Sequence, residues 1–379
     1  MPNLLYEIGI EQLPAAYLEP GLDQLRDRTE ELLQEHRLET EEVHACGTPR
    51  RMTVVASEVP EQQEEAVEEV VGPPAHVAFD DDENPTEAAE GFARSQGVAV
   101  EDLRVEDTEK GPYVVAERRE EGNPATEVLP DILLEATRSV TFPKSMRWTS
   151  DGVDFARPIR WLVALLDEQE LDLTINSVDA GRESRGHMFL SPEPFPLPKA
   201  DYSTYRDELA ERHVIVEPDE RRQIVREQIR EMLEAEGHTF REDGLLNEVA
   251  NMVEYPCAAE GEFDPGYLEV PDPVLAAAMT EHQRYFPVYD EHGSLVSMFV
   301  SVVDRTEDEA ETVIRGNERV LRARLEDARF FWNKDRETTL EDRVPELADV
   351  VFLQELGSDL DRAERLERAC AELAGKVEM

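Results

Sequence analysis

The chain has 379 residues, with 87 Asp and Glu against 39 Lys and Arg, so its formal net charge at pH 7 is -48. Because 40% of the residues are hydrophobic and fall in periodic segments, the composition excludes a disordered acidic chain and favours a globular protein of two or three domains. Three widely spaced cysteines exclude a disulfide framework.

The excess of carboxylates indicates the environment rather than the fold. Only five residues are lysine, so most of the positive charge is carried by arginine. Such a surface stays soluble when salt screens its self-repulsion, which is typical of adaptation to a high-salt cytoplasm. The N-terminus has no basic and apolar leader pattern, and no apolar run approaches the length of a membrane span. We therefore expect a cytoplasmic protein, without a membrane partner, from a halophile.

The first half of the chain alternates predicted strands and helices around an acidic stretch. Apolar periodicity predicts strands at 4–10, 52–57, 113–118 and 159–166, and helices at 15–37, 85–96 and 126–140. Residues 60–84 are rich in carboxylates and turn-forming residues, which predicts an exposed acidic insertion over about 60–125.

Four prolines within residues 191–198 exclude a helix or central strand there and predict a linker at 191–200. Beyond it, helices are predicted at 202–212, 218–236, 245–253, 318–333 and from 359 onward, with a hairpin of strands at 285–289 and 295–303. The second hairpin strand is apolar on both faces, which predicts a central place in its sheet. Asn317 is the expected N-cap of the helix at 318–333, whose expected core residues include Val320, Leu321, Phe331 and Trp332.

These elements predict a multi-domain α+β fold with mixed or antiparallel sheets and packed helices, because no regular βαβ alternation is present. We expect domains at 1–190 and 201–340 on either side of the linker. Residues 341–379 would begin a helical region that is truncated, because the helical pattern still continues at Met379.

The sequence contains no pattern of a self-sufficient active site. The phosphate-loop, dinucleotide-binding, zinc-protease and nucleophile-elbow motifs are absent. The eight histidines show no pair at the usual spacing of metal ligands. We therefore expect no catalytic residues, no metal site and no cofactor in this chain.

Small clusters of basic residues stand out against the acidic background. Arginine binds phosphate and carboxylate with two parallel hydrogen bonds, so these clusters are the candidates for contacting a nucleic acid or a protein partner. Any single arginine could instead pack on a neighbouring aromatic ring or pair within the protein. The candidate residues are Arg50, Arg51, Lys144, Arg147, Arg157, Arg160, Arg185, His282, Arg284, Arg315, Arg319 and Arg322.

At these clusters the sequence resembles the beta subunit of bacterial heterotetrameric glycyl-tRNA synthetase. Residues 7–14 are similar to the EIGTEELP opening of that family and depart from it at Ile10 and Gln12. Further motifs follow in the same order: TPRR at Thr48, AAEGFAR at Ala88, PKSMRW at Pro143, FARPIRW at Phe155, RGHMF at Arg185, HQRYFPVYD at His282, RGNERVLRARLEDARFFWNKD at Arg315 and LQELGS at Leu353. The resemblance covers the chain from end to end.

The resemblance implies a subunit without its own active site. In the family, the alpha subunit holds the aminoacylation site and uses ATP and Mg²⁺, whereas the beta subunit mainly engages tRNA. It also implies a module akin to the B3/B4 domain of phenylalanyl-tRNA synthetase within residues 201–340, and an HD-type helical region beginning at 341–379. The implied partners are the alpha subunit and tRNA(Gly).

Two other functions stay open at this point. A free-standing RNA-binding module would be expected to carry a broad basic face, which the net charge disfavours. An independent hydrolase of the editing type would need a convergent nucleophile, base or metal, and none is visible from spacing. The leading hypothesis is a non-catalytic part of an enzyme that attaches glycine to tRNA(Gly).

Overall fold

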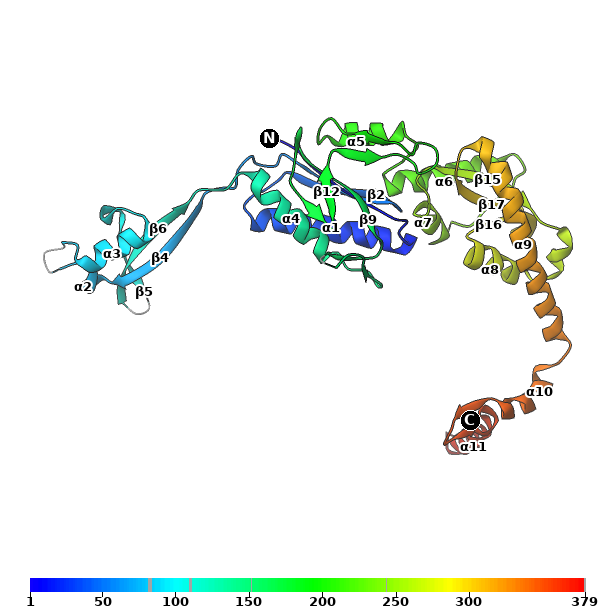
Figure 1. Cartoon of the computed structure of the whole chain (residues 1–379). Coiled ribbons are helices and arrows are strands. Elements are labelled where there is room, and N and C mark those ends of the chain that lie inside the picture. Colours follow the sequence, from blue (N-terminus) through cyan, green and yellow to red (C-terminus); the bar gives the residue numbers. More distant parts are fainter. Residues whose placement is uncertain (81–83, 109–110, 151, 243, 378–379) are drawn as a thin grey trace. The chain divides into compact units, whose positions relative to one another are not determined.

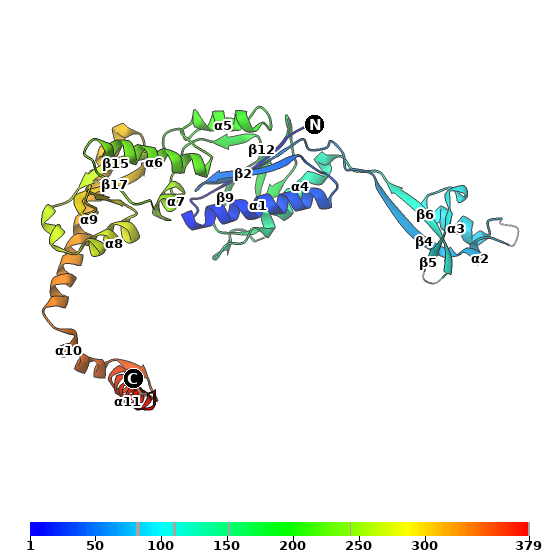
Figure 2. The same ribbon diagram turned by 180° about the vertical axis from the view of Figure 1, so that it is seen from behind.

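The computed structural model describes residues 1–80, 84–108, 111–150, 152–242 and 244–377. The chain divides into two compact units, each described here by itself. Unit 1 consists of Met1–Ile224 and Leu246–Pro256, and unit 2 of Val225–Leu245 and Cys257–Met379. Figures 1 and 2 show the chain from opposite sides. Helices and antiparallel or mixed sheets occur throughout, which confirms the α+β prediction.

A mixed sheet forms the centre of unit 1. Its strand order is β11-β12-β9-β1-β3-β2, with β10 paired to β9. Strand β12 runs parallel to β9, whereas β1 pairs antiparallel with both β3 and β9. The strands are β1 (Leu4–Ile10), β2 (Glu42–Thr48), β3 (Arg51–Ser57), β9 (Ile159–Leu166), β10 (Gln169–Glu170), β11 (Thr174–Ile175) and β12 (Val178–Gly181).

Both faces of this sheet are covered, and the alternation of side chains along β1 separates them. Leu4, Tyr6, Ile8 and Ile10 face the core formed with helices α1 (Ala15–Glu35) and α4 (Ala125–Ser139), which lie side by side in Figure 1. Leu5 and Glu7 face the opposite side, where helix α5 (Tyr202–Ala210) packs. Side chains of β1 that point to the same side as Glu7 therefore contact α5 and the segments around it.

The segment predicted as a linker contributes to this second face. Residues 194–196 form strand β14 (Pro194–Pro196), which pairs with β13 (Glu183–Arg185). Phe195, Leu197 and Ala200 are buried in the core with α5. The prolines keep the segment out of helices and large sheets, as expected, but the segment lies within unit 1 rather than between the two units. A second short pair is β7 (Met146–Arg147) with β8 (Asp154–Phe155).

The acidic insertion has its own small core. Its sheet has the order β4-β6-β5, and Ala78, Ala89 and Val114 form a buried cluster beside it. The elements are β4 (Ala66–Pro74), α2 (Ala75–Ala78), α3 (Glu87–Gln96), a 3-10 turn at Val100–Asp102, β5 (Arg104–Thr108) and β6 (Gly111–Glu120). Much of the stretch expected to be turns, residues 60–84, is therefore strand β4 and helix α2.

Unit 2 is built on a three-stranded antiparallel sheet with the order β15-β17-β16, so β17 is central, as its apolar faces predict. The elements are α6 (Pro218–Glu234), α7 (Gly244–Ala250), β15 (Pro256–Glu262), a 3-10 turn at Pro265–Glu269, α8 (Asp272–Gln283), β16 (Phe286–Tyr289), β17 (Leu295–Asp304), α9 (Glu307–Arg336), α10 (Leu340–Arg343), a 3-10 turn at Val344–Asp349, β18 (Val351–Leu353), β19 (Gly357–Ser358) and α11 (Asp359–Val377). The first turns of α6 and the last turns of α7 belong to unit 1. Met379, to which the last helix was expected to run, lies outside the described residues.

Helix α9 begins eleven residues before the predicted start at 318, since its first residue is Glu307. The prediction of Asn317 as an N-cap is wrong, because Asn317 lies inside the helix and its side chain donates to Ser301 Oγ at 3.0 Å. Gly316 lowers helix propensity without ending the helix. Leu321 is buried and Trp332 packs against the core, but Val320 and Phe331 are 45% and 61% exposed, so their assignment to the core is also wrong.

Within the part of the chain that the structure describes, no helix combines the length and the apolar character needed to cross a bilayer.

Candidate functional site

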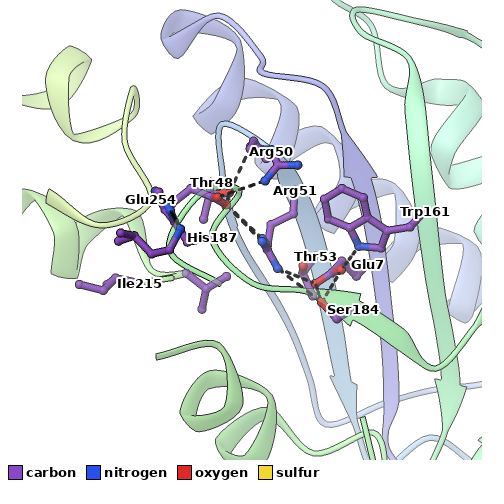
Figure 3. Close-up of polar contacts among 12 residues, drawn as sticks. Glu7, Thr48, Arg50, Arg51, Thr53, Trp161, Ser184, His187, Ile215 and Glu254 are labelled. Atoms are coloured by element: carbon purple, nitrogen blue, oxygen red, sulfur yellow. Dashed lines mark hydrogen bonds and ion pairs between the residues drawn. The ribbon is translucent and has the colours of Figure 1, made fainter. Parts of the chain in front are cut away.

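The TPRR motif forms a tight hairpin between β2 and β3. Thr48 pairs with Arg51 across the turn, and Thr48 Oγ1 accepts a hydrogen bond from the backbone N–H of Arg50 at 3.1 Å. The carbonyl of Arg50 in turn accepts from the backbone N–H of Ile10 at 2.8 Å. The hairpin is thereby fixed against the end of β1, and Arg50 and Arg51 point into the region shown in Figure 3.

Glu7, at the middle of β1, is a buried carboxylate surrounded by donors. Ser184 Oγ lies 2.8 and 3.0 Å from its two oxygens, and Trp161 Nε1 and the Tyr205 hydroxyl also donate to it. Burial and the nearby carboxylate raise the pKa of Tyr205, so its phenol keeps the proton that it donates. With its oxygens occupied by these donors, Glu7 is suited to fixing strands and helix α5 in register rather than to accepting a proton from a substrate.

Arg51 joins Glu7 to a second buried carboxylate, Glu254. Its Nη1 lies 3.5 Å from Glu7 Oε2, and its Nη2 lies 3.2 Å from Glu254 Oε1, which also accepts from Thr48 Oγ1 at 2.6 Å. Burial disfavours the charge of Arg51, but the two carboxylates outweigh that effect and raise its pKa. The sequence groups Arg51 with the candidates for tRNA or partner contact, yet its side chain is completely buried and its charge is matched inside unit 1.

The indole of Trp161 lies close to three guanidinium groups. Its indole lies over Gly9 so closely that a Cβ at Gly9 would come within 1.9 Å of it, so only glycine fits there. The Cζ atoms of Arg50, Arg51 and Arg185 lie 5.6, 5.6 and 5.5 Å from the centroid of the ring. Cations at this distance are attracted by the face of an indole, so one tryptophan holds three like charges together.

Arg50 and Arg185 differ from Arg51 in how their charge is balanced. The side chain of Arg50 is 16% exposed, its Nη1 is 3.7 Å from Glu254 Oε2, and its Nε and Nη1 have no hydrogen-bond partner among the residues that the structure describes. Burial lowers the pKa of Arg50, and Glu254 partly offsets this. Arg185 is exposed and makes no ion pair with the described residues. Donors left unsatisfied in this way favour binding of an anion.

A cleft of about 480 Å³ adjoins this cluster on the side of Trp161. Arg160, Arg182 and Arg185 line it together with Trp161, and the acidic side chains of Glu170, Asp179 and Glu183 complete its charged wall. Arg160 pairs with Glu11 at 3.2 Å and Arg182 with Glu170 at 2.5 Å, so Arg185 is the one arginine lining the cleft that makes no ion pair with the described residues. The arrangement can bind an anion, and no nucleophile and base converge on it.

The other predicted candidates of unit 1 lie on the surface. Lys144 and Arg147 are exposed, and Arg147 pairs with Asp154 at 2.8 Å. Arg157 is exposed and donates through Nε to the carbonyl of Gln12 at 3.0 Å. The structure therefore brings Arg50, Arg51 and Arg185 together around Trp161, with Arg160 lining the same cleft. Lys144 and Arg147 do not belong to this group.

The candidates of unit 2 are distributed over two helices. His282 is exposed near the end of α8, and Arg284 is the left-handed C-cap of that helix, donating to the carbonyls of its last turn. Arg315, Arg319 and Arg322 are exposed on α9. Arg315 pairs with Glu311 of the preceding turn, whereas Arg319 and Arg322 make no ion pair with the described residues. These two therefore keep exposed positive charge in a strongly acidic protein.

Four members of the buried cluster were not singled out from the sequence: Glu7 as an ion-pair partner, Ser184, Tyr205 and Glu254. Glu254 lies 203 residues from Arg51, and Tyr205 lies 198 residues from Glu7. The only local signal for Glu7 is a charged residue inside an apolar strand, because Leu4 to Ile10 are otherwise Leu, Tyr, Ile and Gly. A charge at such a position requires a buried partner.

Comparisons with known proteins identify the family. A model of the family described as glycyl-tRNA synthetase beta subunit matches residues 4–379. The chain is 44% identical over 378 residues to the glycine–tRNA ligase beta subunit of Moorella thermoacetica, and the match covers 100% of this chain and 54% of that protein. The corresponding subunits of Halothermothrix orenii and Geobacter metallireducens are 42% and 41% identical, and the match again covers 54% of each.

The chain thus spans about half the length of the curated relatives that it matches. The match extends over both units and includes every motif on which the resemblance was based. The sequence-based prediction of the family is confirmed, and the chain belongs to the glycyl-tRNA synthetase beta subunit family.

Proposed function

We propose that this chain supports the ATP-dependent attachment of glycine to tRNA(Gly) by engaging tRNA and by assembling with an alpha subunit. It contributes no active site, and ATP and Mg²⁺ act on the alpha subunit. Family membership supports the reaction, because the matched relatives are named as beta subunits of a glycine–tRNA ligase.

The observation that carries the tRNA-binding part is the presence of exposed, unbalanced guanidinium groups on a chain with a net charge of -48. Arg185, Arg319 and Arg322 are exposed and make no ion pair with the described residues, although carboxylates are abundant nearby in the sequence. A surface that leaves these charges unpaired is suited to phosphate, which guanidinium binds through two parallel hydrogen bonds. Trp161 adds an indole against which Arg185 is held in place.

The test uses the full-length beta subunit reconstituted with its alpha subunit. Arg185→Gln should raise the KM for tRNA and reduce the slope of log K against log salt concentration by about 1, because one phosphate contact is lost. Glycine-dependent ATP–pyrophosphate exchange without tRNA should stay at the wild-type rate, because activation belongs to the alpha subunit.

The matched control is Arg147→Gln, which removes the same charge from an exposed arginine that is already paired with Asp154. Its KM for tRNA should stay near the wild-type value. Equal effects of Arg185→Gln and Arg147→Gln would show that only the overall charge matters. Loss of ATP–pyrophosphate exchange in Arg185→Gln, together with dissociation in sedimentation, would assign Arg185 to the alpha-subunit interface instead.

A further inference from the structure

His44, Cys46 and Glu217 bring together three side chains of the types that bind metal ions. His44 and Cys46 are two residues apart on β2, so both project from the same face of that strand. Glu217 lies directly before helix α6. One ligand atom from each residue lies within 4.8 Å of the other two, and His44 Nε2 is 2.8 Å from Glu217 Oε1.

The backbone holds these residues in place. Gly47, next to Cys46, donates its backbone N–H to the carbonyl of Val216 at 3.0 Å, which joins β2 to the segment that carries Glu217. On the other side β2 pairs with β3 along its whole length, so His44 and Cys46 cannot turn to the opposite face without a shift in register. The three ligands therefore come from two segments that are fixed to each other within unit 1.

A fourth residue, Tyr202, orients the potential ligands. Its hydroxyl donates to Glu217 Oε1, and its ring meets the His44 ring edge-on at 5.1 Å between centroids. Residues that hydrogen-bond a ligating carboxylate without touching the metal are a regular part of metal sites, because they fix the ligand in its binding orientation. The hydrogen bond from Tyr202 thus has the role of such a supporting contact.

The burial of the ligands is uneven. Cys46 is completely buried, whereas the side chain of His44 is 41% exposed. One thiolate and one carboxylate would balance the charge of a divalent cation bound with a neutral imidazole. Sulfur, nitrogen and oxygen together suit Zn²⁺, which accepts all three at about 2.0–2.3 Å in a tetrahedral arrangement. Ligands at those distances lie about 3.3–3.7 Å apart, so His44 and Glu217 need to separate by less than about 1 Å.

We propose that His44, Cys46 and Glu217 form a binding site for a zinc-like divalent cation, with water in the fourth position on the exposed side of His44. The sequence predicts no metal site because Glu217 lies 173 residues from His44, and no local spacing links the two. The site shares no residue with the arginine cluster, and the proposal does not depend on the proposed role in tRNA engagement.

Cobalt(II) tests the site, because it replaces zinc in such sites and a cobalt–thiolate bond gives a near-ultraviolet charge-transfer band. The protein carries Cys370→Ser, since Cys370 is exposed and could bind cobalt by itself. After treatment with a chelator, titration should reach one cobalt per chain with the thiolate band, and zinc should displace the cobalt. Cys46→Ala should abolish the band, and His44→Gln or Glu217→Gln should weaken binding at least tenfold.

Tyr202→Phe separates the supporting contact from the ligands themselves. It should weaken cobalt binding about 10–100-fold while keeping the charge-transfer band, as expected for the loss of a hydrogen bond to a ligand. Zinc should also raise the melting temperature of the wild-type protein but not that of His44→Gln, because a ligand that binds only the folded state stabilises it.

The controls are Cys257→Ser, which removes the other buried cysteine, and His292→Gln, which removes an exposed histidine next to Glu291. Both should bind cobalt as the parent protein does. A titration without a thiolate band would overturn the proposal and leave His44 and Glu217 as an ion pair. A thiolate band that persists in Cys46→Ala with unchanged affinity for cobalt would also overturn the proposal. Because His44 is partly exposed, His44→Gln is expected to fold and keeps the test decisive if Cys46→Ala does not.

Discussion

At the scale of single residues, Arg51 balances the negative charge of two buried carboxylates, Glu7 and Glu254. Replacing Arg51 with Met would keep much of its volume but leave Glu7 and Glu254 buried without their shared cation. Removing one partner of a buried ion pair costs about 3–5 kcal/mol, because the remaining charge is uncompensated. We expect a loss of unfolding free energy of that size, measured by urea denaturation of unit 1 within the whole chain.

Arg147→Met is the matched control for this prediction. Arg147 is exposed and pairs with Asp154 in solvent, so its removal should leave the urea midpoint nearly unchanged. A small effect of Arg51→Met, comparable to that of the control, would mean that Glu7 and Glu254 are balanced by other donors.

Asp201 gives a prediction about pH. As the N-cap of α5 it accepts from the backbone N–H of Thr204 at 2.8 Å and from the Thr204 hydroxyl at 2.6 Å. These hydrogen bonds hold the pKa of Asp201 below its usual value of 3.8. The carboxylate therefore contributes stability that is present above pH 3.8 and is lost as the pH falls through the lower pKa of the folded state.

Asp201→Ala should cost about 0.5–2 kcal/mol at neutral pH through loss of the cap. This penalty should shrink as the pH falls below 3.8, where the wild type also becomes protonated. Asp201→Asn separates the contribution of the cap hydrogen bonds from that of the negative charge, because asparagine caps as well as aspartate but does not titrate. Unfolding curves at a series of pH values measure the difference, and a penalty independent of pH would contradict the assignment to the charged form.

The residues of the arginine cluster could be predicted only in part. The basic motifs at Arg50 and Arg185 identify side chains that the structure places around Trp161. The burial of Arg51 could not be predicted, because its partner Glu254 is 203 residues away and nothing in the local pattern distinguishes it from Arg50. The same holds for Glu217 beside His44. Local periodicity identifies the face of a strand, whereas long-range pairing decides which charged groups meet there.

At the scale of secondary structure, helix α9 carries part of the exposed positive charge of unit 2. Arg319 and Arg322 face solvent without an ion pair to the described residues, while Leu321 and Leu325 are buried. Changing both arginines to Gln should leave the melting temperature nearly unchanged, as expected for exposed sites. In the reconstituted enzyme it should weaken tRNA binding or alpha-subunit association, and for tRNA reduce the salt slope by about 2.

Arg315→Gln on the same helix is the control, because Arg315 is already paired with Glu311. Its effect on tRNA binding should be less than half that of the double variant. If the double variant charges tRNA at the wild-type rate across a salt series, the exposed face of α9 serves only solubility.

The elements themselves were predictable where a hydrophobic period was long. The helix at 15–37 and the strands at 4–10 and 159–166 agree with α1, β1 and β9 to within two residues. The edge strand β2 was not predicted, because only its last three residues are buried and it shows no clear alternation. Helix α9 was predicted too short, because Gly316 and Asn317 are typical of a helix boundary. The buried residues Ala310 and Ile314 show that the apolar face of the helix continues before them.

At the scale of the whole molecule, the excess of carboxylates predicts a stability that rises with salt. Repulsion between surface charges is screened within a Debye length of about 10 Å at 0.1 M salt and about 3 Å at 1 M. Thermal melts between about 0.1 and 2 M KCl should therefore show a rising midpoint. A flat or falling midpoint would remove the interpretation of the composition as an adaptation to high salt.

The chain alone is expected neither to activate glycine nor to hydrolyse glycyl-tRNA. No nucleotide-binding motif is present in the sequence, and the donors around Glu7 leave that carboxylate unsuited to general-base catalysis. Glycine-dependent ATP–pyrophosphate exchange and deacylation of glycyl-tRNA should both stay at background with the isolated chain. Deacylation well above background would instead favour the editing-type alternative.

The return of residues 246–256 to unit 1 has a consequence for biosynthesis. Glu254 follows Arg51 by 203 residues, which takes a ribosome about 10–40 s to translate at about 5–20 residues per second. During that interval the nascent chain contains Glu7 and Arg51 but not yet Glu254, and Val225–Leu245 of unit 2 is translated before Glu254. Completion of the first unit is therefore coupled in time to the start of the second, and a chain released before Glu254 would be a natural target for chaperones and proteases.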